Sequence, residues 1–140
     1  MSDLDADVPA PPSPAPDLDS QAFWVAAQRR ELTLCRCRTC RTWLQPPLER
    51  CRLCAGPTGF EAASGGGEIY SYIVVRHPSV PAFVHLIPYV VALVQLDEGV
   101  RMPARLVGVD PAVVVIGARV QAGFELLPGA AEPALIFTLA

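Results

Sequence analysis

Two pairs of cysteines are the residues of this chain best suited to chemistry. Each pair has the spacing Cys-x-x-Cys, and the four side chains are Cys37, Cys40, Cys51 and Cys54. Each pair can present two thiolates from one tight turn, and four thiolates form the ligand set of a tetrahedral structural zinc site. Because no ligand position remains for water, we expect one Zn²⁺ with a structural role. Two disulfides, or free thiols, are the alternative interpretations. The spacing predicts a compact, rubredoxin-like zinc ribbon over residues 32–61.

Three other residues with reactive side chains are less well placed for chemistry. Cys35 lies only two residues before Cys37, so a strand residue is favoured over a further metal ligand. His77 and His85 have no serine, cysteine or carboxylate that the sequence places to form a catalytic triad. We therefore predict no catalytic residue in this chain.

The positive charge of the chain is concentrated around the cysteine pairs. All eleven basic residues are arginines, and seven of them fall between positions 29 and 52, where only Glu31 and Glu49 oppose them. From position 65 onward, four arginines face six acidic residues. The basic ribbon is either an ordinary solvated surface or a site for phosphates or for an acidic partner.

The N-terminal residues differ in composition from the rest of the chain. Residues 1–19 are rich in aspartate and proline and contain no basic residue, which predicts a disordered acidic tail rather than a signal peptide. The longest strongly apolar run, residues 87–96, is too short to span a bilayer. We expect a cytoplasmic protein, in which thiols stay reduced and available to zinc.

A short helix should connect this tail to the ribbon. Ser20 is a plausible N-cap, and residues 20–31 place Phe23, Ala26 and Ala27 on one apolar stripe with Trp24 beside it. So short a helix must dock on another element, either the ribbon or a partner. After the ribbon, residues 62–67 end in three glycines and predict a flexible joint.

The remaining residues have the pattern of short strands. Residues 97–99 predict a hairpin turn, and Asp110-Pro111 predicts a short helical turn between the third and fourth strands. The five expected strands cover residues 68–76, 89–96, 100–106, 119–126 and 134–139. This order is typical of an OB-fold barrel, here over residues 65–140, with an antiparallel sandwich as the alternative. The expected fold class is therefore small and mainly β.

The loop between the first two of these strands is unusually apolar for a loop. It covers residues 77–88 and could close over the barrel core or contact a partner or ligand. With the helix aromatics, it supplies the side chains that we predict at a partner interface: Phe23, Trp24, Phe83, Val84, Leu86 and Ile87.

Taken together, these motifs resemble one known family over about residues 20–139. The matching features, in order, are Phe23-Trp24, the two cysteine pairs, Pro46-Pro47, and the stretches at 67–70, 88–94, 96–101 and 115–117. The chain resembles the thiolase-associated zinc-ribbon/OB-fold proteins, an acyl-CoA-associated domain of unknown function. It departs from them at Arg41, where a glycine often follows the first cysteine pair, and at Leu48, where an arginine often follows the prolines.

The resemblance implies a non-catalytic subunit with no activity alone. It would assist a thiolase-like enzyme, such as a thiolase or a side-chain aldolase of lipid or steroid metabolism, by completing its acyl-CoA tunnel. The partner would supply the nucleophile, acid and base. Guanidinium groups of the ribbon could contact the phosphates of CoA; the candidates are Arg36, Arg38, Arg41, Arg50 and Arg52.

Two other functions remain open from the sequence. A zinc ribbon joined to an OB fold can bind single-stranded nucleic acid, although the barrel half is net acidic and offers only Tyr70, Tyr72 and Tyr89 as main candidates for stacking. A hydrolase or thioesterase that acts alone is the third possibility, and no catalytic constellation supports it.

Overall fold

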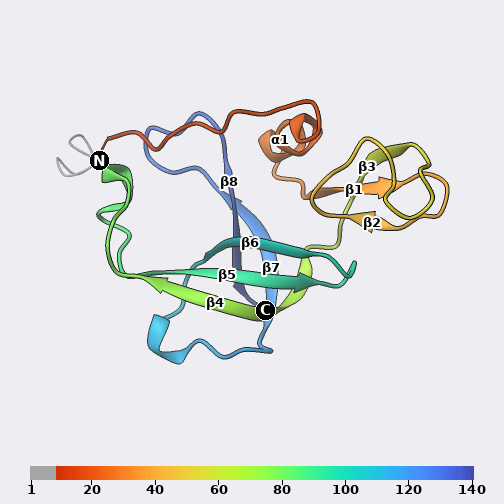
Figure 1. Cartoon of the computed structure of the whole chain (residues 1–140). Coiled ribbons are helices and arrows are strands. Elements are labelled where there is room, and N and C mark those ends of the chain that lie inside the picture. The colour runs from red at the N-terminus through yellow and green to blue at the C-terminus, as the bar shows by residue number, and fades with distance from the viewer. Residues whose placement is uncertain (1–8) are drawn as a thin grey trace.

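A computed structural model describes residues 9–140 of the chain. One short helix, α1 (Gln21–Gln28), lies above a closed barrel, and a small three-stranded sheet extends from one end of that barrel (Figure 1). This arrangement confirms the predicted fold class. Within residues 9–140, no helix is both long enough and apolar enough to cross a membrane.

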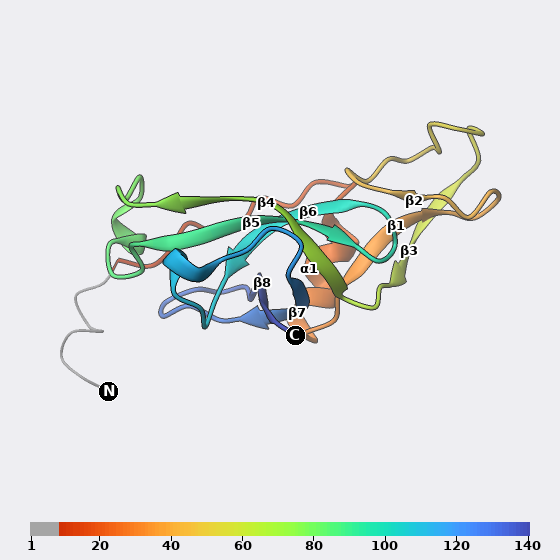
Figure 2. The ribbon, with the colours of Figure 1, turned by 90° about the horizontal axis from the view of Figure 1, so that it is seen from below.

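The small sheet forms the ribbon that carries the cysteines. Its strands are β1 (Thr33–Cys37), β2 (Trp43–Leu44) and β3 (Thr58–Ala62), and β1 pairs antiparallel with both of the others. Viewed from below, this ribbon lies at the opposite end of the molecule from the loop between β4 and β5 (Figure 2).

The barrel closes in the order β4-β5-β6-β8-β7. Its strands are β4 (Gly66–Val75), β5 (Tyr89–Leu96), β6 (Arg101–Leu106), β7 (Arg119–Glu125) and β8 (Ala134–Leu139). All neighbours run antiparallel except β6 and β8, which pair in parallel through Arg105 and Leu106. Two 3-10 helices connect strands: η1 (Pro81–Phe83), which the sequence did not predict, and η2 (Pro111–Val113), capped by the Asp110 carboxylate.

Alternate side chains of the strands fill the barrel. On β5, Val90, Ala92, Val94 and Leu96 are buried, and they pack with Ile69 of β4 and Phe137 of β8. Residues 89–96 are apolar almost throughout, a pattern typical of a strand buried on both faces. In the structure the other face of β5, including Val91 and Leu93, is only half-buried. This side of the barrel sheet therefore presents apolar side chains outward.

The ribbon and the barrel share one hydrophobic core. Leu32 and Leu34 are buried in the same cluster as the barrel side chains, and Phe23 and Trp43 pack against that cluster. Successive side chains of β1 point to opposite faces, so Leu34 faces the shared core while Cys35 and Cys37 belong to a second cluster with Leu44. One strand thus links the cysteine site to the barrel.

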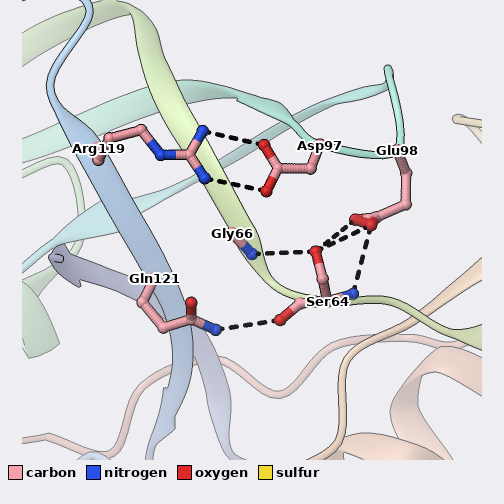
Figure 3. Close-up of polar contacts among 6 residues, drawn as sticks. All are labelled: Ser64, Gly66, Asp97, Glu98, Arg119 and Gln121. Atoms are coloured by element: carbon pink, nitrogen blue, oxygen red, sulfur yellow. Dashed lines mark hydrogen bonds and ion pairs between the residues drawn. The ribbon is translucent and has the colours of Figure 1, made fainter.

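The segment predicted as a flexible joint is held by hydrogen bonds (Figure 3). The Ser64 hydroxyl donates to the Glu98 carboxylate at 3.0 Å, and the Gln121 amide donates to the Ser64 carbonyl at 3.1 Å. Gly66 and Gly67 begin β4 and are buried, and a Cβ at Gly67 would lie 2.6 Å from the Gln95 carbonyl oxygen. The glycines therefore permit close strand packing.

An ion pair with two hydrogen bonds lies beside this segment and joins Arg119 of β7 to Asp97, which follows β5. The Arg119 guanidinium donates to both carboxylate oxygens of Asp97, each at 2.9 Å (Figure 3). These hydrogen bonds hold the pKa of Asp97 below its ordinary value. Because the folded-state pKa is lowered, this contribution to stability is complete at neutral pH and is lost only as pH falls through the acidic range.

The start of α1 differs from the sequence prediction. Ser20 occupies the N-cap position, but its side chain makes no capping hydrogen bond to the helix. Instead, its backbone N–H and its hydroxyl both donate to the Asp17 carboxylate at 2.8 Å, which lowers the pKa of Asp17. Of the predicted disordered tail, residues 1–8 lie outside the described residues. Residues 9–16 form no helix or strand.

Candidate metal centre and surfaces

The four predicted ligands come together at the outer end of the ribbon. The Sγ atoms of Cys37, Cys40, Cys51 and Cys54 all lie within 4.8 Å of one another. Sγ of Cys37 is 3.5 Å from Sγ of Cys54, and Sγ of Cys40 is 3.6 Å from Sγ of Cys51. A tetrahedral zinc with Zn–S bonds of about 2.3 Å requires S···S separations of roughly 3.8 Å. The cluster could therefore hold a metal such as zinc with little adjustment.

Two similar turns present these sulfurs. In the first, the backbone N–H groups of Thr39 and Cys40 donate to Sγ of Cys37 at 3.3 Å; in the second, the N–H of Leu53 donates to Sγ of Cys51 at 3.4 Å. N–H donors of this kind favour a thiolate over a thiol. The backbone is thus already arranged to stabilise negative sulfurs before any metal binds.

The pKa values of three of the thiols are shifted, and not all in the same direction. Burial opposes ionisation of Cys37, but the N–H groups of Cys40 and Thr39 outweigh it and lower the pKa of that thiol. The Thr42 hydroxyl and N–H lower the pKa of Cys40 to about 6. The N–H of Gly56 favours the Cys54 thiolate, yet the Cys37 sulfur and burial raise its pKa to about 11. Four thiolates at this separation repel one another, so a divalent cation is the natural counter-charge.

Each turn is followed by a residue with a left-handed backbone conformation. Arg41 follows the first pair with φ 66°, and Ala55 follows the second with φ 62°. Arg41 is the position at which the sequence was expected to depart from a glycine, and the structure shows that this arginine adopts a left-handed backbone conformation. L-residues adopt this region at a cost of about 1–2 kcal/mol, so both turns are strained.

Ala55→Gly should relieve this strain and raise the free energy of unfolding by about 1 kcal/mol. Ala55 is exposed and its side chain makes no hydrogen bond or ion pair that the change could remove. Chemical denaturation of the metal-loaded protein measures the difference. Ala62→Gly, at an exposed position in β3, is the matched control and should lower the free energy of unfolding. An equal change in that free energy for both variants would contradict the claim that Ala55 is strained.

The fifth cysteine lies outside the cluster. Cys35 is 1% exposed on β1, and its thiol donates to the Leu48 carbonyl at 3.5 Å. It packs beneath the site with Leu44 and the half-buried Phe60. Its environment is that of a small core residue on a strand, the interpretation that the sequence favoured.

The ribbon arginines divide into two groups. Arg36 and Arg41 both form ion pairs with Glu61, at 3.2 Å and 2.7 Å, and Arg36 also stacks 4.4 Å from the centre of the Trp43 ring. Arg38, Arg50 and Arg52 are exposed, and among residues 9–140 none of the three has an acidic side chain within ion-pairing distance. These three are the guanidinium groups free to meet an external anion.

The predicted interface side chains occupy different environments. Phe23 packs on the barrel core and meets Trp24 edge to face, with 5.0 Å between ring centres. Phe83 is half-buried against Tyr89, with ring centres 6.3 Å apart. Leu86 and Ile87 are half-buried, whereas Val84 is 43% exposed. Trp24 and Phe83 lie on one groove although 59 positions separate them.

A second apolar surface escaped the sequence analysis. Ile73 of β4 and three residues after β6 are each about two-thirds exposed: Val113, Val115 and Ile116. The segment 114–118 lies beside β4, because Ile69 exchanges backbone hydrogen bonds with Gly117 and Ala118. The sequence analysis included Ile73 only as one residue of the expected strand 68–76. Only the barrel geometry places these side chains on the outside.

Neither histidine lies in a catalytic arrangement. His77 and His85 are exposed in the loop between β4 and β5, and among the described residues no acidic side chain contacts either imidazole. The described part of the chain also has no buried polar or charged residue. Among residues 9–140, the thiol of Cys35 is the one fully buried nucleophile outside the cysteine cluster, and it packs as a core residue of β1.

A four-cysteine ribbon joined through a shared core to an OB-like barrel defines the class of this protein. Residues 60–125 match the family described as the C-terminal OB-fold domain of ChsH2. The chain is 34% identical over 111 residues to a DUF35 domain-containing scaffold protein of Methanothermobacter thermautotrophicus, and the match covers 83% of that protein. The chain belongs to the DUF35 family, as the resemblance of its motifs indicated.

Two longer relatives and one solved structure extend the comparison. The chain is 44% identical over 108 residues to a probable enoyl-CoA hydratase alpha subunit of Thermomonospora curvata. It is 35% identical over 127 residues to the 3-oxo-4,17-pregnadiene-20-carboxyl-CoA hydratase alpha subunit of Mycobacterium tuberculosis. It spans only 33% and 39% of their lengths. A chain of the Ltp2-ChsH2(DUF35) aldolase matches with TM-score 0.82 and 38% identity, over 90% of this chain and 98% of that one.

Proposed function

We propose that this chain is a non-catalytic accessory subunit of a thiolase-like enzyme that makes or breaks a carbon–carbon bond next to an acyl-CoA thioester. The observation that carries the proposal is the match over almost the whole of a DUF35 chain from an aldolase complex. The steroid acid–CoA named for the mycobacterial relative suggests a steroid or other bulky acyl group as substrate class. We also propose a cytoplasmic location, in which the four thiols stay reduced.

The absence of a catalytic constellation in the described residues supports a subunit without activity of its own. The histidines are exposed and unpaired, and the core is apolar throughout. In a division of labour, the partner supplies the nucleophile, acid and base. This chain then contributes by holding active-site loops and the acyl-CoA tunnel in their productive geometry.

The metal of the ribbon is Zn²⁺ in this proposal, held by Cys37, Cys40, Cys51 and Cys54. With four thiolate ligands it supplies no chemistry beyond fixing the two turns, because no coordination position stays open to a substrate. These two turns hold in place the three arginines that form no ion pair. Arg38, Arg50 and Arg52 lie on this ribbon, and their guanidinium groups suit the phosphates of CoA.

Two apolar surfaces are candidates for the contact with the enzyme. One is the loop between β4 and β5, where the sequence predicted an interface and where Val84 is exposed. The other is formed by Ile73, Val113, Val115 and Ile116. Large exposed aliphatic side chains on adjacent segments are typical of a surface that a partner covers. We favour the second surface, because four side chains there are each about two-thirds exposed.

Affinity purification of the tagged full-length chain from cells of its source tests the proposal. We expect a thiolase-like protein in stoichiometric amount, together with acyl-CoA lyase or condensing activity that the chain lacks alone. Ile116→Asp should remove most of the bound enzyme while the variant stays folded, because a buried unpaired carboxylate opposes the contact. Leu126→Asp, an equally apolar exposed position elsewhere, is the control and should leave binding intact.

Two other outcomes would overturn the proposed function, and a third would overturn the choice of interface. Nucleic acid in the eluate, with salt-sensitive binding, would favour the single-strand binding module. Acyl-CoA turnover by the purified chain alone would establish an enzyme. Loss of partner binding in Leu126→Asp as well as Ile116→Asp would move the interface away from the surface favoured here.

A further inference from the structure

A groove of about 350 Å³ lies between α1, η1 and the loop that precedes β8. Trp24 of α1 and Phe83 of η1 form part of its wall, and Leu127 and Pro133 add apolar side chains from the loop. Residues 11–14 of the N-terminal segment complete the lining. The groove thus joins three parts of the chain that are far apart in sequence.

The segment that meets this groove is rich in proline. Residues 9–16 read Pro-Ala-Pro-Pro-Ser-Pro-Ala-Pro and form no helix or strand. Pro11 and Pro14 are half-buried, whereas Pro12 and Ser13 between them are exposed. A period of three residues is that of the polyproline II helix, in which every third side chain faces the same way. All of residues 11–14 line the groove, and Pro11 and Pro14 are the two whose side chains other parts of the chain partly cover.

The segment lies directly on the loop before β8. A Cβ placed on Gly129 would lie 3.1 Å from the Ala10 side chain and 3.3 Å from its Cα. Figure 1 shows the same arrangement, with the N-terminal segment running beside this loop on its way to α1. Gly129 has φ 79°, a left-handed conformation, so its lack of a side chain serves both the turn and the close approach.

We propose that the apolar wall of this groove formed by Trp24, Phe83, Leu127 and Pro133 is a binding surface for polyproline II segments, and that residues 9–16 lie along it within the same chain. Aromatic side chains that line a shallow groove recognise such segments through the flat faces of proline rings. Little conformational entropy is lost on binding, because proline-rich chains are already extended. The proposal is independent of the accessory-subunit function.

Tethering gives the internal segment a large advantage over any free ligand. A short linker to α1 keeps residues 9–16 at a high effective concentration near the groove. A proline-rich segment of another polypeptide can enter only when the internal one leaves. Trp24 and Phe83, which the sequence predicted at a partner interface, then become accessible together.

Fluorine NMR of the full-length chain labelled with 5-fluorotryptophan tests the occupancy. The chain has two tryptophans, so Trp43, which packs against the barrel core, is an internal reference for Trp24. Pro14→Ala should shift the Trp24 resonance toward the position of a solvent-exposed indole and leave Trp43 unchanged. Pro12→Ala removes an exposed proline from the same segment and should leave both resonances unchanged. Equal shifts in the two variants would overturn the proposal.

A titration with free peptide tests recognition itself. In the Pro11→Ala/Pro14→Ala double variant, a synthetic peptide of residues 9–16 should return the Trp24 resonance to its wild-type position. The same peptide with alanine in place of the two half-buried prolines, Pro11 and Pro14, should have no effect. If neither peptide moves the resonance, or both do so equally, the groove does not recognise polyproline and the contact is only local packing.

Discussion

Cys37→Ser should release the metal and unfold the ribbon. The metal–ligand set contributes about 10–16 kcal/mol of apparent binding free energy in small zinc domains at neutral pH. That is as large as the whole stability of an ordinary domain, about 5–15 kcal/mol. Cys37 is also fully buried and receives two backbone N–H bonds, so a hydroxyl cannot replace its thiolate. Metal content by mass spectrometry and far-ultraviolet circular dichroism are the measurements.

The fifth cysteine provides the matched control. Cys35→Ala removes an equally buried thiol from the same strand, two residues away, but this sulfur is not part of the four-cysteine cluster. The variant should keep a full equivalent of metal and lose only a modest amount of stability. Removal of the metal from the wild type with a chelator should reproduce the effect of Cys37→Ser. A Cys37→Ser protein that retains both metal and ribbon would show that the cluster is not a structural metal site.

Leu34→Ala should destabilise the whole protein by about 2–5 kcal/mol, the range for buried leucines. Leu34 is 1% exposed and belongs to the barrel core although it lies on a ribbon strand. Because one core joins both parts, we expect a single cooperative unfolding transition at a lower denaturant concentration. Tryptophan fluorescence and release of the metal to a colorimetric chelator should report the same midpoint.

Leu53→Ala is the control for this experiment. Leu53 is also a ribbon leucine, but it is 67% exposed on the second cysteine turn, so its loss should change stability by less than about 0.5 kcal/mol. Two separate transitions in Leu34→Ala, with the metal released before the barrel unfolds, would show that ribbon and barrel are independent units.

The sequence was most informative where chemistry is local. The Cys-x-x-Cys spacing predicted that four cysteines cluster, because each pair needs only one turn of backbone to converge, and the structure brings all four sulfurs together. The apolar run at 89–96 and the last apolar segment at 134–139 were predicted as strands with the bounds that the structure has. Asp110-Pro111 predicted the short helical turn, because proline fixes the backbone angle and aspartate caps the next N–H.

Features that depend on contacts distant in sequence were not predictable. Glycine at positions 65–67 indicated flexibility, yet its role is close packing against β5 and β7, which lie 30 and 55 residues further along the chain. Ser20 was expected to cap α1, but the nearby Asp17 competes for its N–H and hydroxyl. Composition predicted disorder for residues 1–19, whereas the groove that meets Pro11 and Pro14 is built from segments at 24, 83 and 127–134.

By itself, the sequence determined which four cysteines cluster, which segments along the chain form strands, and the family, because these follow from spacing, apolar patterning and the order of motifs. Tertiary structure alone decided which surfaces face outward. It turned Leu34 toward the barrel and Cys37 toward the cysteine cluster, paired Arg36 and Arg41 with Glu61, and left Ile73 and Ile116 exposed. The physical reason is that the exposure of a side chain depends on every element packed around it, and those elements meet only when the barrel closes.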